Sequence, residues 1–218
     1  MVVHELTGIN AVMLYSNIML SEGGKGILTP RQGVVLLGIV NLLASFLSIY
    51  VAKTFTRRAL FVWGHLAIGL AHIAVGATLH YEYPTLTLVS MCAFLIAYEN
   101  SSGCITWLYC SEVAVDGALG LVGTTGYSIT FLLALLTQPL MISPLRESGT
   151  FVLFGVISLF SALWCHVFLK ETSTCKTDKE KKELYVPEDL LQTSELKQAE
   201  MEISMGFAYG NSIELELD

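Results

Sequence analysis

Residues 86–110 read LTLVSMCAFLIAYENSSGCITWLYC, a long run in which Glu99 is the only charged residue. A helix crosses a bilayer with about 20 mostly apolar residues, so this stretch has the length and composition of a membrane span. Its centre is unusual, because the six consecutive residues from Tyr98 to Gly103 carry no aliphatic side chain. A lipid-facing helix would not be built in this way. We therefore expect a locally irregular helix that lines a wet cavity.

Five further apolar runs approach or exceed the length of a membrane span, with breaker-rich turns between them. The six predicted spans are Val2–Leu20, Gly33–Ala52, Ala59–Leu79, Leu86–Cys110, Leu119–Ile142 and Phe151–Leu169. The first is the weakest, because His4 and Glu5 interrupt it. The chain is 53% hydrophobic with a mean hydropathy of +0.60, and its 14% of charged residues is well below the roughly 25% of soluble domains. We therefore predict an all-α membrane protein in which residues 1–169 form a six-helix transmembrane bundle.

The remaining residues, 170–218, differ in composition and are predicted to form a polar, acidic, mostly disordered cytoplasmic tail. They hold six lysines and twelve acidic residues, which is more than half of the charged residues of the chain. This acidity does not favour a nucleic-acid partner. A short helix is compatible with Pro187–Met201, because proline suits a first helical turn and three leucines give a modest stripe.

The distribution of basic residues predicts which side of the bundle faces the cytoplasm. Lys53, Arg57 and Arg58 abut the membrane in the turn after the second span, on the same side as the tail. The basic residues of the opposite side are Lys25, Arg31 and Arg146. The concentrated cluster and the tail are therefore placed in the cytoplasm.

Four side chains inside the predicted spans are candidates for binding a polar ligand, because such groups usually face a cavity or another helix in lipid. Glu99 either accepts hydrogen bonds from a ligand or is paired or protonated within the bundle. Asn10 and Asn41 each present donors and an acceptor, which suits a vicinal diol, although either could bond a neighbouring helix instead. Trp107 could stack on a ring-shaped ligand or fill the bundle.

The sequence does not point to an enzyme, a metal or another cofactor. No nucleophile–base constellation, P-loop or dinucleotide fingerprint is visible, and the five cysteines lack metal-binding spacing. His65 and His72 share a helix face. Interhelical hydrogen bonding is the preferred interpretation of this pair, and a proton relay is the alternative.

Several motifs, in order along the chain, resemble the sugar porters of the major facilitator superfamily, which include the facilitative hexose transporters. TGINAVMLYS at 7–16 is similar to the seventh helix of that family, and GIVN at 38–41 is similar to its eighth. Tyr98-Glu99, Trp107 and Glu112 have the spacing of its tenth helix. The resemblance assigns cytoplasmic gate or turn positions to Arg57, Arg58, Glu112 and Glu171.

This resemblance implies the C-terminal six-helix half of a twelve-helix carrier, in which two bundles rock around a central site. Carried over residue by residue, the implied contacts to a hexose or similar polyol are Asn10, Asn41, Glu99 and Trp107. His4 and Glu5 stand where the family has paired glutamines, and they belong to the predicted site. The implied partners are a small sugar, the lipid bilayer of a plasma membrane, and an N-terminal six-helix half from the same gene or a separate chain.

Departures from the family pattern keep a second interpretation open. The hinge of the tenth helix lacks its prolines, and the arginine that usually pairs with Glu112 falls on Leu119, so we expect Glu112 to lack its usual partner. The match to the polar residues of the eleventh helix is poor and consists of Thr130, Phe131 and Ala134. The alternative is a non-transporting membrane sensor or interaction subunit with the same fold.

Overall fold

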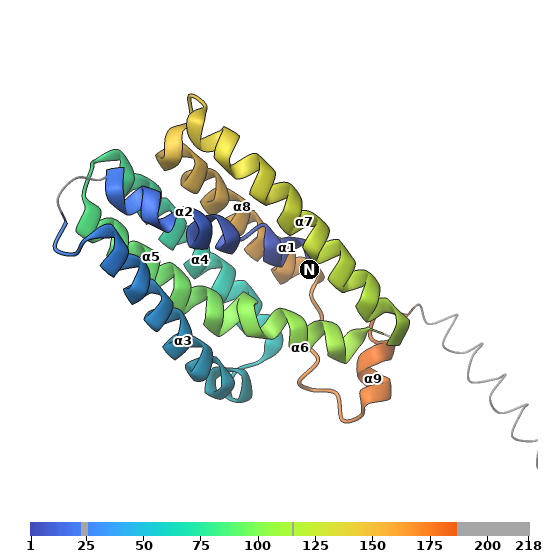
Figure 1. Cartoon of the computed structure of the whole chain (residues 1–218). Helices are drawn as coiled ribbons and strands as arrows, with labels where there is room; N and C mark the ends of the chain where they lie inside the picture. Colours follow the sequence, from blue (N-terminus) through green and yellow to red (C-terminus); the bar gives the residue numbers. More distant parts are fainter. Residues whose placement is uncertain (23–25, 115, 187–218) are drawn as a thin grey trace, which may run out of the picture. The chain divides into compact units, whose positions relative to one another are not determined.

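The computed structural model describes residues 1–22, 26–114 and 116–186, which divide between two compact units, Met1–Cys175 and Lys176–Asp218. The described part of the first unit is helical (Figure 1), and its helices are α1 (Val2–Glu5), α2 (Ile9–Glu22), α3 (Pro30–Thr54), α4 (Arg57–His80), α5 (Pro84–Tyr98), the π-helical turn η1 (Glu99–Gly103), α6 (Cys104–Val113), α7 (Asp116–Ile142) and α8 (Arg146–Phe168). The second unit contains α9 (Asp178–Glu183). The helix predicted across Pro187–Met201 lies outside the described residues.

Five of the six predicted spans are helical segments with the length and apolar composition of a membrane crossing. They are Pro30–Thr54, Arg57–His80, Pro84–Val113, Gly117–Ile142 and Arg146–Phe168. The third of these runs through α5, η1 and α6, and α5 and α6 lie nearly end to end in Figure 1. The prediction of an all-α membrane protein is confirmed.

The first predicted span, Val2–Leu20, is not one helix, and the prediction of a continuous helix there is wrong. α1 ends at Glu5, α2 begins at Ile9, and Gly8 between them has a φ of +77°. Only glycine adopts this left-handed conformation without strain, and a Cβ here would also lie 2.9 Å from the ring of Phe154. The carbonyl oxygen of Thr7 accepts a hydrogen bond from His72 Nε2 at 2.7 Å. A buried side chain therefore satisfies backbone that the break leaves without a helical partner.

The long helices begin where the sequence supplies capping residues. At the start of α3, the Thr29 hydroxyl accepts from the backbone N–H of Gln32, whose side chain accepts in turn from the backbone N–H of Thr29. This reciprocal capping box satisfies two donors that a helix start leaves unpaired. The Thr56 hydroxyl caps α4 by accepting from the backbone N–H of Ala59.

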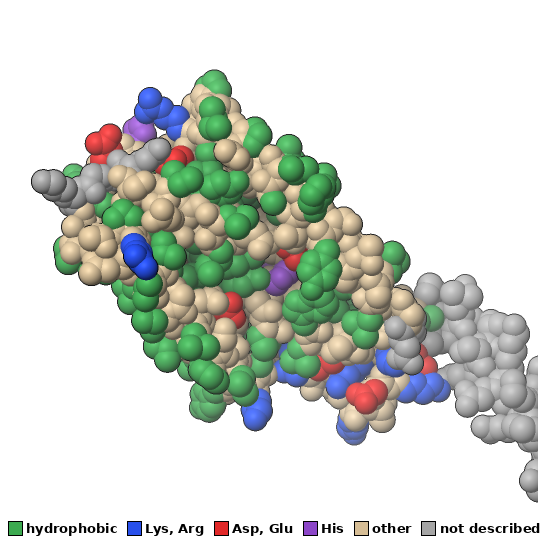
Figure 2. All heavy atoms as spheres, in the orientation of Figure 1, with side chains coloured by type: hydrophobic (Ala, Val, Ile, Leu, Met, Phe, Trp, Pro, Cys, Tyr) green, Lys and Arg blue, Asp and Glu red, His purple; other side chains and the backbone are tan. Residues whose placement is uncertain are grey.

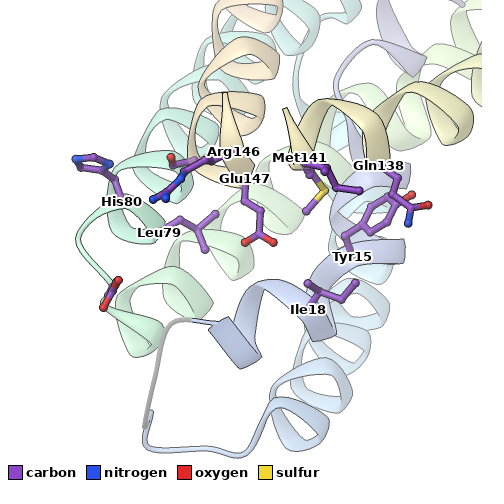
Figure 3. Close-up of a pocket in the computed structure, with 11 residues that line it drawn as sticks. Tyr15, Ile18, Leu79, His80, Gln138, Met141, Arg146 and Glu147 are labelled. Carbon is purple, nitrogen blue, oxygen red and sulfur yellow. The ribbon is translucent and has the colours of Figure 1, made fainter. Parts of the chain in front are cut away.

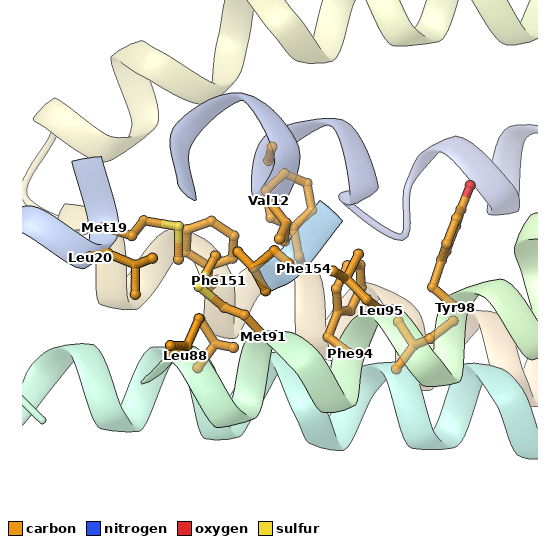
Figure 4. Close-up of a cluster of buried hydrophobic side chains, with 14 residues drawn as sticks. Val12, Met19, Leu20, Leu88, Met91, Phe94, Leu95, Tyr98, Phe151 and Phe154 are labelled. Atoms are coloured by element: carbon orange, nitrogen blue, oxygen red, sulfur yellow. The ribbon is translucent and has the colours of Figure 1, made fainter. Parts of the chain in front are cut away.

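The core lies between α2, α5 and α8 and is rich in aromatic and sulfur-containing side chains (Figure 4). Met91, Phe94 and Phe151 are fully buried there. Beside this core, α4 and α8 make the most extensive contact between any two helices. Gly69 and Gly155 allow the two helices to approach closely, because neither carries a Cβ. A Cβ built on either glycine would lie 3.0 Å from the backbone oxygen of the other. Small residues at such a crossing are typical of packed membrane helices.

The helices α3 and α7 leave most of their apolar side chains uncovered. Only 17% of the most apolar window of α3 is buried, and only 6% of that of α7. Phe46 and Leu121, for example, are 65% and 70% exposed. Figure 2 shows hydrophobic side chains spread along both helices. Exposed apolar surface of this extent suits contact with lipid or with another membrane bundle.

Candidate functional site

An open cavity of about 320 Å³ lies among α1, α2, α3, η1, α6 and α7. Its lining includes all six residues that the sequence predicts to contact substrate: His4, Glu5, Asn10, Asn41, Glu99 and Trp107. Figure 2 shows histidine and acidic side chains in the middle of the displayed face, among hydrophobic and neutral groups. The structure thus brings together residues that are far apart in the sequence, and their binding role stays a prediction.

The irregular turn η1 positions Glu99 at this cavity. The expectation of an irregular helix is confirmed, because Glu99–Gly103 forms a π-helical turn within the long span. The side chains of Asn100 and Ser101 donate to the backbone oxygens of Ile96 and Ala97 at 2.8 and 2.6 Å. Such bonds from short polar side chains compete with regular helical bonding and are common where a helix deforms.

A histidine from α1 joins the first span to η1. His4 Nδ1 lies 3.0 Å from the backbone oxygen of Ser102, and Nε2 lies 3.2 Å from the hydroxyl of Tyr98. Because a carbonyl oxygen only accepts, Nδ1 carries the hydrogen, and Nε2 of a neutral ring accepts from Tyr98. The Glu5 carboxylate lies 3.8 Å from the same Nε2. His4 and Glu5 are both only 6% exposed, so they form a buried polar pair in the lining of the cavity.

Two donors hold the Glu5 carboxylate in place. Asn10 Nδ2 donates to Glu5 Oε2 at 3.2 Å, and the Thr130 hydroxyl donates to the same oxygen at 2.6 Å. Thr130 also lines the cavity, although it was predicted only as part of a poor match to the eleventh helix. The first helix is thereby fixed to α7 at the cavity wall.

Polar groups from α3 and η1 add further hydrogen-bond acceptors to the site. The Ser45 hydroxyl donates to Glu99 Oε2 at 2.8 Å. Asn41 Oδ1 is buried and has no hydrogen-bond partner among the described residues. Trp107 stands at the rim and is 41% exposed. Sequence reasoning missed Ser45, although it lies four residues after Asn41 and therefore on the same helix face.

The two histidines of α4 have separate partners. His72 bonds the Thr7 oxygen in the first helix break, so the interhelical interpretation is confirmed for this residue. His65 Nδ1 instead bonds the backbone oxygen of Phe61 in its own helix at 2.8 Å.

The four residues predicted for the cytoplasmic gate or turns also lie together. Arg57 Nη2 lies 3.2 Å from Glu112 Oε1. Glu112 is therefore paired although Leu119 stands where the usual arginine would be, because Arg57 in another helix supplies the positive charge. The Glu171 carboxylate accepts from the backbone N–H groups of Arg57 and Arg58 at 3.0 and 2.9 Å, at the first two positions of α4. A carboxylate at this place also complements the positive end of the helix dipole.

The segment after α8 is anchored to this cluster. Burial acts to raise the pKa of Glu171, but hydrogen bonds from Ser173 and from the backbone of Arg57 and Arg58 lower it to about 2. The Thr172 hydroxyl donates to Glu112 Oε2 at 2.5 Å. The first compact unit extends to Cys175 and so includes this segment.

A larger hollow of about 650 Å³ lies where α2, α4 and α7 end and α8 begins. It contains none of the predicted substrate residues. Figure 3 shows its side chains, which include Tyr15, Leu79, Met141, Arg146 and Glu147. We take the smaller cavity as the candidate site, because it combines the irregular turn η1 with a buried acceptor that has no partner in the described part of the chain.

Sequence comparison gives one family and many relatives. Residues 1–183 match the family described as "Sugar (and other) transporter". Sugar transport protein MST7 of Oryza sativa subsp. japonica is 29% identical over 184 residues, which cover 77% of this chain and 36% of the relative. The facilitated glucose transporter member 2 of solute carrier family 2 from Gallus gallus is 27% identical over 177 residues, which cover 77% and 32%. The chain therefore spans about a third of the length of these relatives.

Solved structures match the fold. The major facilitator superfamily proton:xylose symporter XylE, bound to 6-bromo-6-deoxy-D-glucose, superposes with a TM-score of 0.73 at 19% identity, over 84% of this chain and 41% of that one. A double tryptophan mutant of XylE superposes with a TM-score of 0.75 at 21% identity and the same coverage. At this level of identity the likeness concerns the fold alone.

Proposed function

Because the chain belongs to the sugar (and other) transporter family, we propose that it forms the substrate-binding half of a carrier that moves a hexose or a similar polyol across a membrane. The relatives named above are transport proteins rather than enzymes. The observation that carries the proposal is the convergence of Asn10, Asn41 and Glu99 on one open cavity, with Trp107 at its rim.

The chemistry of the cavity suits a polyol. Carboxylate and amide oxygens accept hydrogen bonds from hydroxyl groups, and amide nitrogens donate to them. Asn41 Oδ1 is buried and has no partner within residues 1–22, 26–114 and 116–186, and such an atom gains most when a ligand hydroxyl bonds it. An indole ring such as that of Trp107 covers the apolar face of a sugar ring. A volume of about 320 Å³ is within the range of small-molecule sites.

The proposed carrier needs a second bundle, because alternating access requires two bundles that rock around one site. The open side of the cavity and the uncovered apolar faces of α3 and α7 support an N-terminal six-helix half as the partner. That half would come from the same gene or from a separate chain. We place the carrier in the plasma membrane, with Arg57, Arg58, Glu112 and Glu171 on the cytoplasmic side.

Binding of radiolabelled D-glucose and D-xylose to the purified full chain tests this proposal. The substitution Asn41→Leu keeps a similar volume and removes the amide, so we expect affinity to fall about five-fold or more. Thr124→Val is the matched control, because Thr124 is exposed on α7 and bonds the backbone of its own helix. Absence of saturable binding to any sugar tested would contradict the proposal.

The sensor or interaction-subunit interpretation differs from the carrier interpretation in one expected result, the restoration of sugar uptake. The replacement of the family glutamines by His4 and Glu5 is the observation that favours it. Both interpretations allow sugar binding, but only a carrier restores uptake when the chain is expressed with an N-terminal half in cells that lack hexose carriers. Binding without restored uptake would favour the sensor.

A further inference from the structure

The candidate cavity has an excess of hydrogen-bond acceptors. Its described lining includes the carboxylates of Glu5 and Glu99 and the partnerless oxygen of Asn41. Glu99 receives one hydrogen bond, from Ser45, although a carboxylate can accept about four. Two donors of the lining, Asn10 Nδ2 and the Thr130 hydroxyl, are both directed at Glu5.

The same cavity has no compensating positive side chain. The described residues that line it include no lysine or arginine, and the α-amino group of Met1 is not among them. The one titratable base is His4, whose Nδ1 hydrogen is directed at the Ser102 oxygen and whose Nε2 faces Tyr98. Two carboxylates in a membrane cavity without a cation are unfavourable, because charge in low dielectric needs a partner of opposite sign.

From this imbalance we propose that the preferred substrate is a cationic amino sugar, whose protonated amine lies between Glu5 and Glu99 while its hydroxyls meet Asn41. This inference rests on the proposed function and narrows its substrate class. An ammonium group offers three donors and no acceptor, and so it matches a wall that offers acceptors. The hydroxyl positions of the sugar ring keep the contacts that a neutral hexose would make.

The test compares four ligands of the same ring size on the full chain in detergent, by calorimetry at about pH 6, where a sugar amine is protonated. The ligands are D-glucosamine, neutral D-glucose, neutral N-acetyl-D-glucosamine and anionic D-glucuronate. The ammonium group of D-glucosamine forms a charged hydrogen bond with a carboxylate, which D-glucose cannot form. We therefore expect D-glucosamine to bind at least about ten-fold more tightly than D-glucose. D-Glucuronate should bind most weakly. At about pH 9 the preference for D-glucosamine should disappear, because the amine is then neutral.

Variants locate the effect. Glu99→Gln should weaken binding of D-glucosamine much more than binding of D-glucose and so abolish the ten-fold preference. Glu82→Gln, which removes an exposed carboxylate outside the cavity, should leave the preference intact. The ligand series on the unmodified chain stands by itself if Glu99→Gln does not fold. Equal affinities for D-glucosamine and D-glucose, or a preference that survives Glu99→Gln, would overturn the amino-sugar inference but leave the proposed function in place. If none of the four ligands binds, the proposed function itself fails.

Discussion

Gly64 is the position where a single added carbon should disturb the candidate site most directly. A Cβ built there would lie 2.0 Å from Cβ and 2.3 Å from Oγ of Ser101, within η1. These two carbons must separate to at least 3.4 Å to reach ordinary contact. Gly64→Ala therefore forces η1 away from α4, and Glu99, at the start of η1, moves with it.

The loss of stability expected for Gly64→Ala can be estimated from the known cost of overpacking. Extra carbons in a packed interior typically cost about 1–3 kcal/mol. For a chain of this length, each kcal/mol shifts the midpoint of thermal unfolding by roughly 2–4 °C. The conflicting atoms belong to the side chain of Ser101, whereas its Cα stays at 3.5 Å, which is ordinary contact. Ser101→Gly should therefore relieve the clash, although alone it removes the bond from Ser101 to Ala97 and destabilises by about 1 kcal/mol.

The assay is a double-mutant cycle on the thermal unfolding of the purified chain in one detergent. Gly64→Ala should lower the midpoint by several degrees, and Ser101→Gly should recover most of that loss in the double variant, with a coupling of about 1–3 kcal/mol. Gly38→Ala is the matched control, because no atom lies within 4 Å of its added carbon. Equal stability of the Gly64→Ala and Gly38→Ala variants, or purely additive effects of Gly64→Ala and Ser101→Gly, would refute the predicted contact between α4 and η1.

Three further predictions concern the cytoplasmic cluster, the orientation and the completeness of the carrier. Glu171→Gln should lower the unfolding midpoint at neutral pH. Folding lowers the pKa of Glu171 from its ordinary 4.5 to about 2. The difference in unfolding midpoint between wild type and variant should therefore be largest above pH 4.5 and vanish as the pH falls to 2. A pH-independent difference in midpoint would contradict this. In a cysteine-free background on intact cells, an impermeant thiol reagent should label cysteine at Arg31 but not at Thr56, and the reverse pattern would invert the orientation. Expressed alone in cells without hexose carriers, the chain should give no saturable sugar uptake, and uptake by the chain alone would show that it needs no N-terminal half.

The local chemistry of the sequence was sufficient to predict most spans and the irregular helix. Apolar run length marks a membrane helix because unpaired backbone is costly in lipid, and that cost acts on every residue. The absence of aliphatic side chains between Tyr98 and Gly103 similarly predicts the deformation that η1 shows. The break at Gly8 was harder to predict. It depends on His72, which lies 65 residues away and satisfies the Thr7 oxygen.

The contacts that hold the predicted residues in place could not be predicted from their spacing in the sequence. Arg57 and Glu112 are 55 residues apart, and nothing local to either indicates that they pair. Thr130 is 125 residues from Glu5, and its bond depends on how α7 lies against α1. Residue types at membrane depth thus identify which groups need partners, whereas the packing of helices decides which partners they receive.

The two irregular backbone segments of the bundle, the break after α1 and the turn η1, depend on one another. The break after α1 and the π-helical turn η1 both leave the regular helical pattern at the candidate cavity, where polar side chains can satisfy the backbone. His4 connects them, because it lies in α1 just before the break and bonds the Ser102 oxygen of η1 at 3.0 Å. Any change that lets α1 reform a continuous helix with α2 would withdraw His4 from η1 and Glu5 from Thr130 together. The shape of the cavity and the position of its carboxylates are therefore set by the same few buried hydrogen bonds that stabilise the irregular turns.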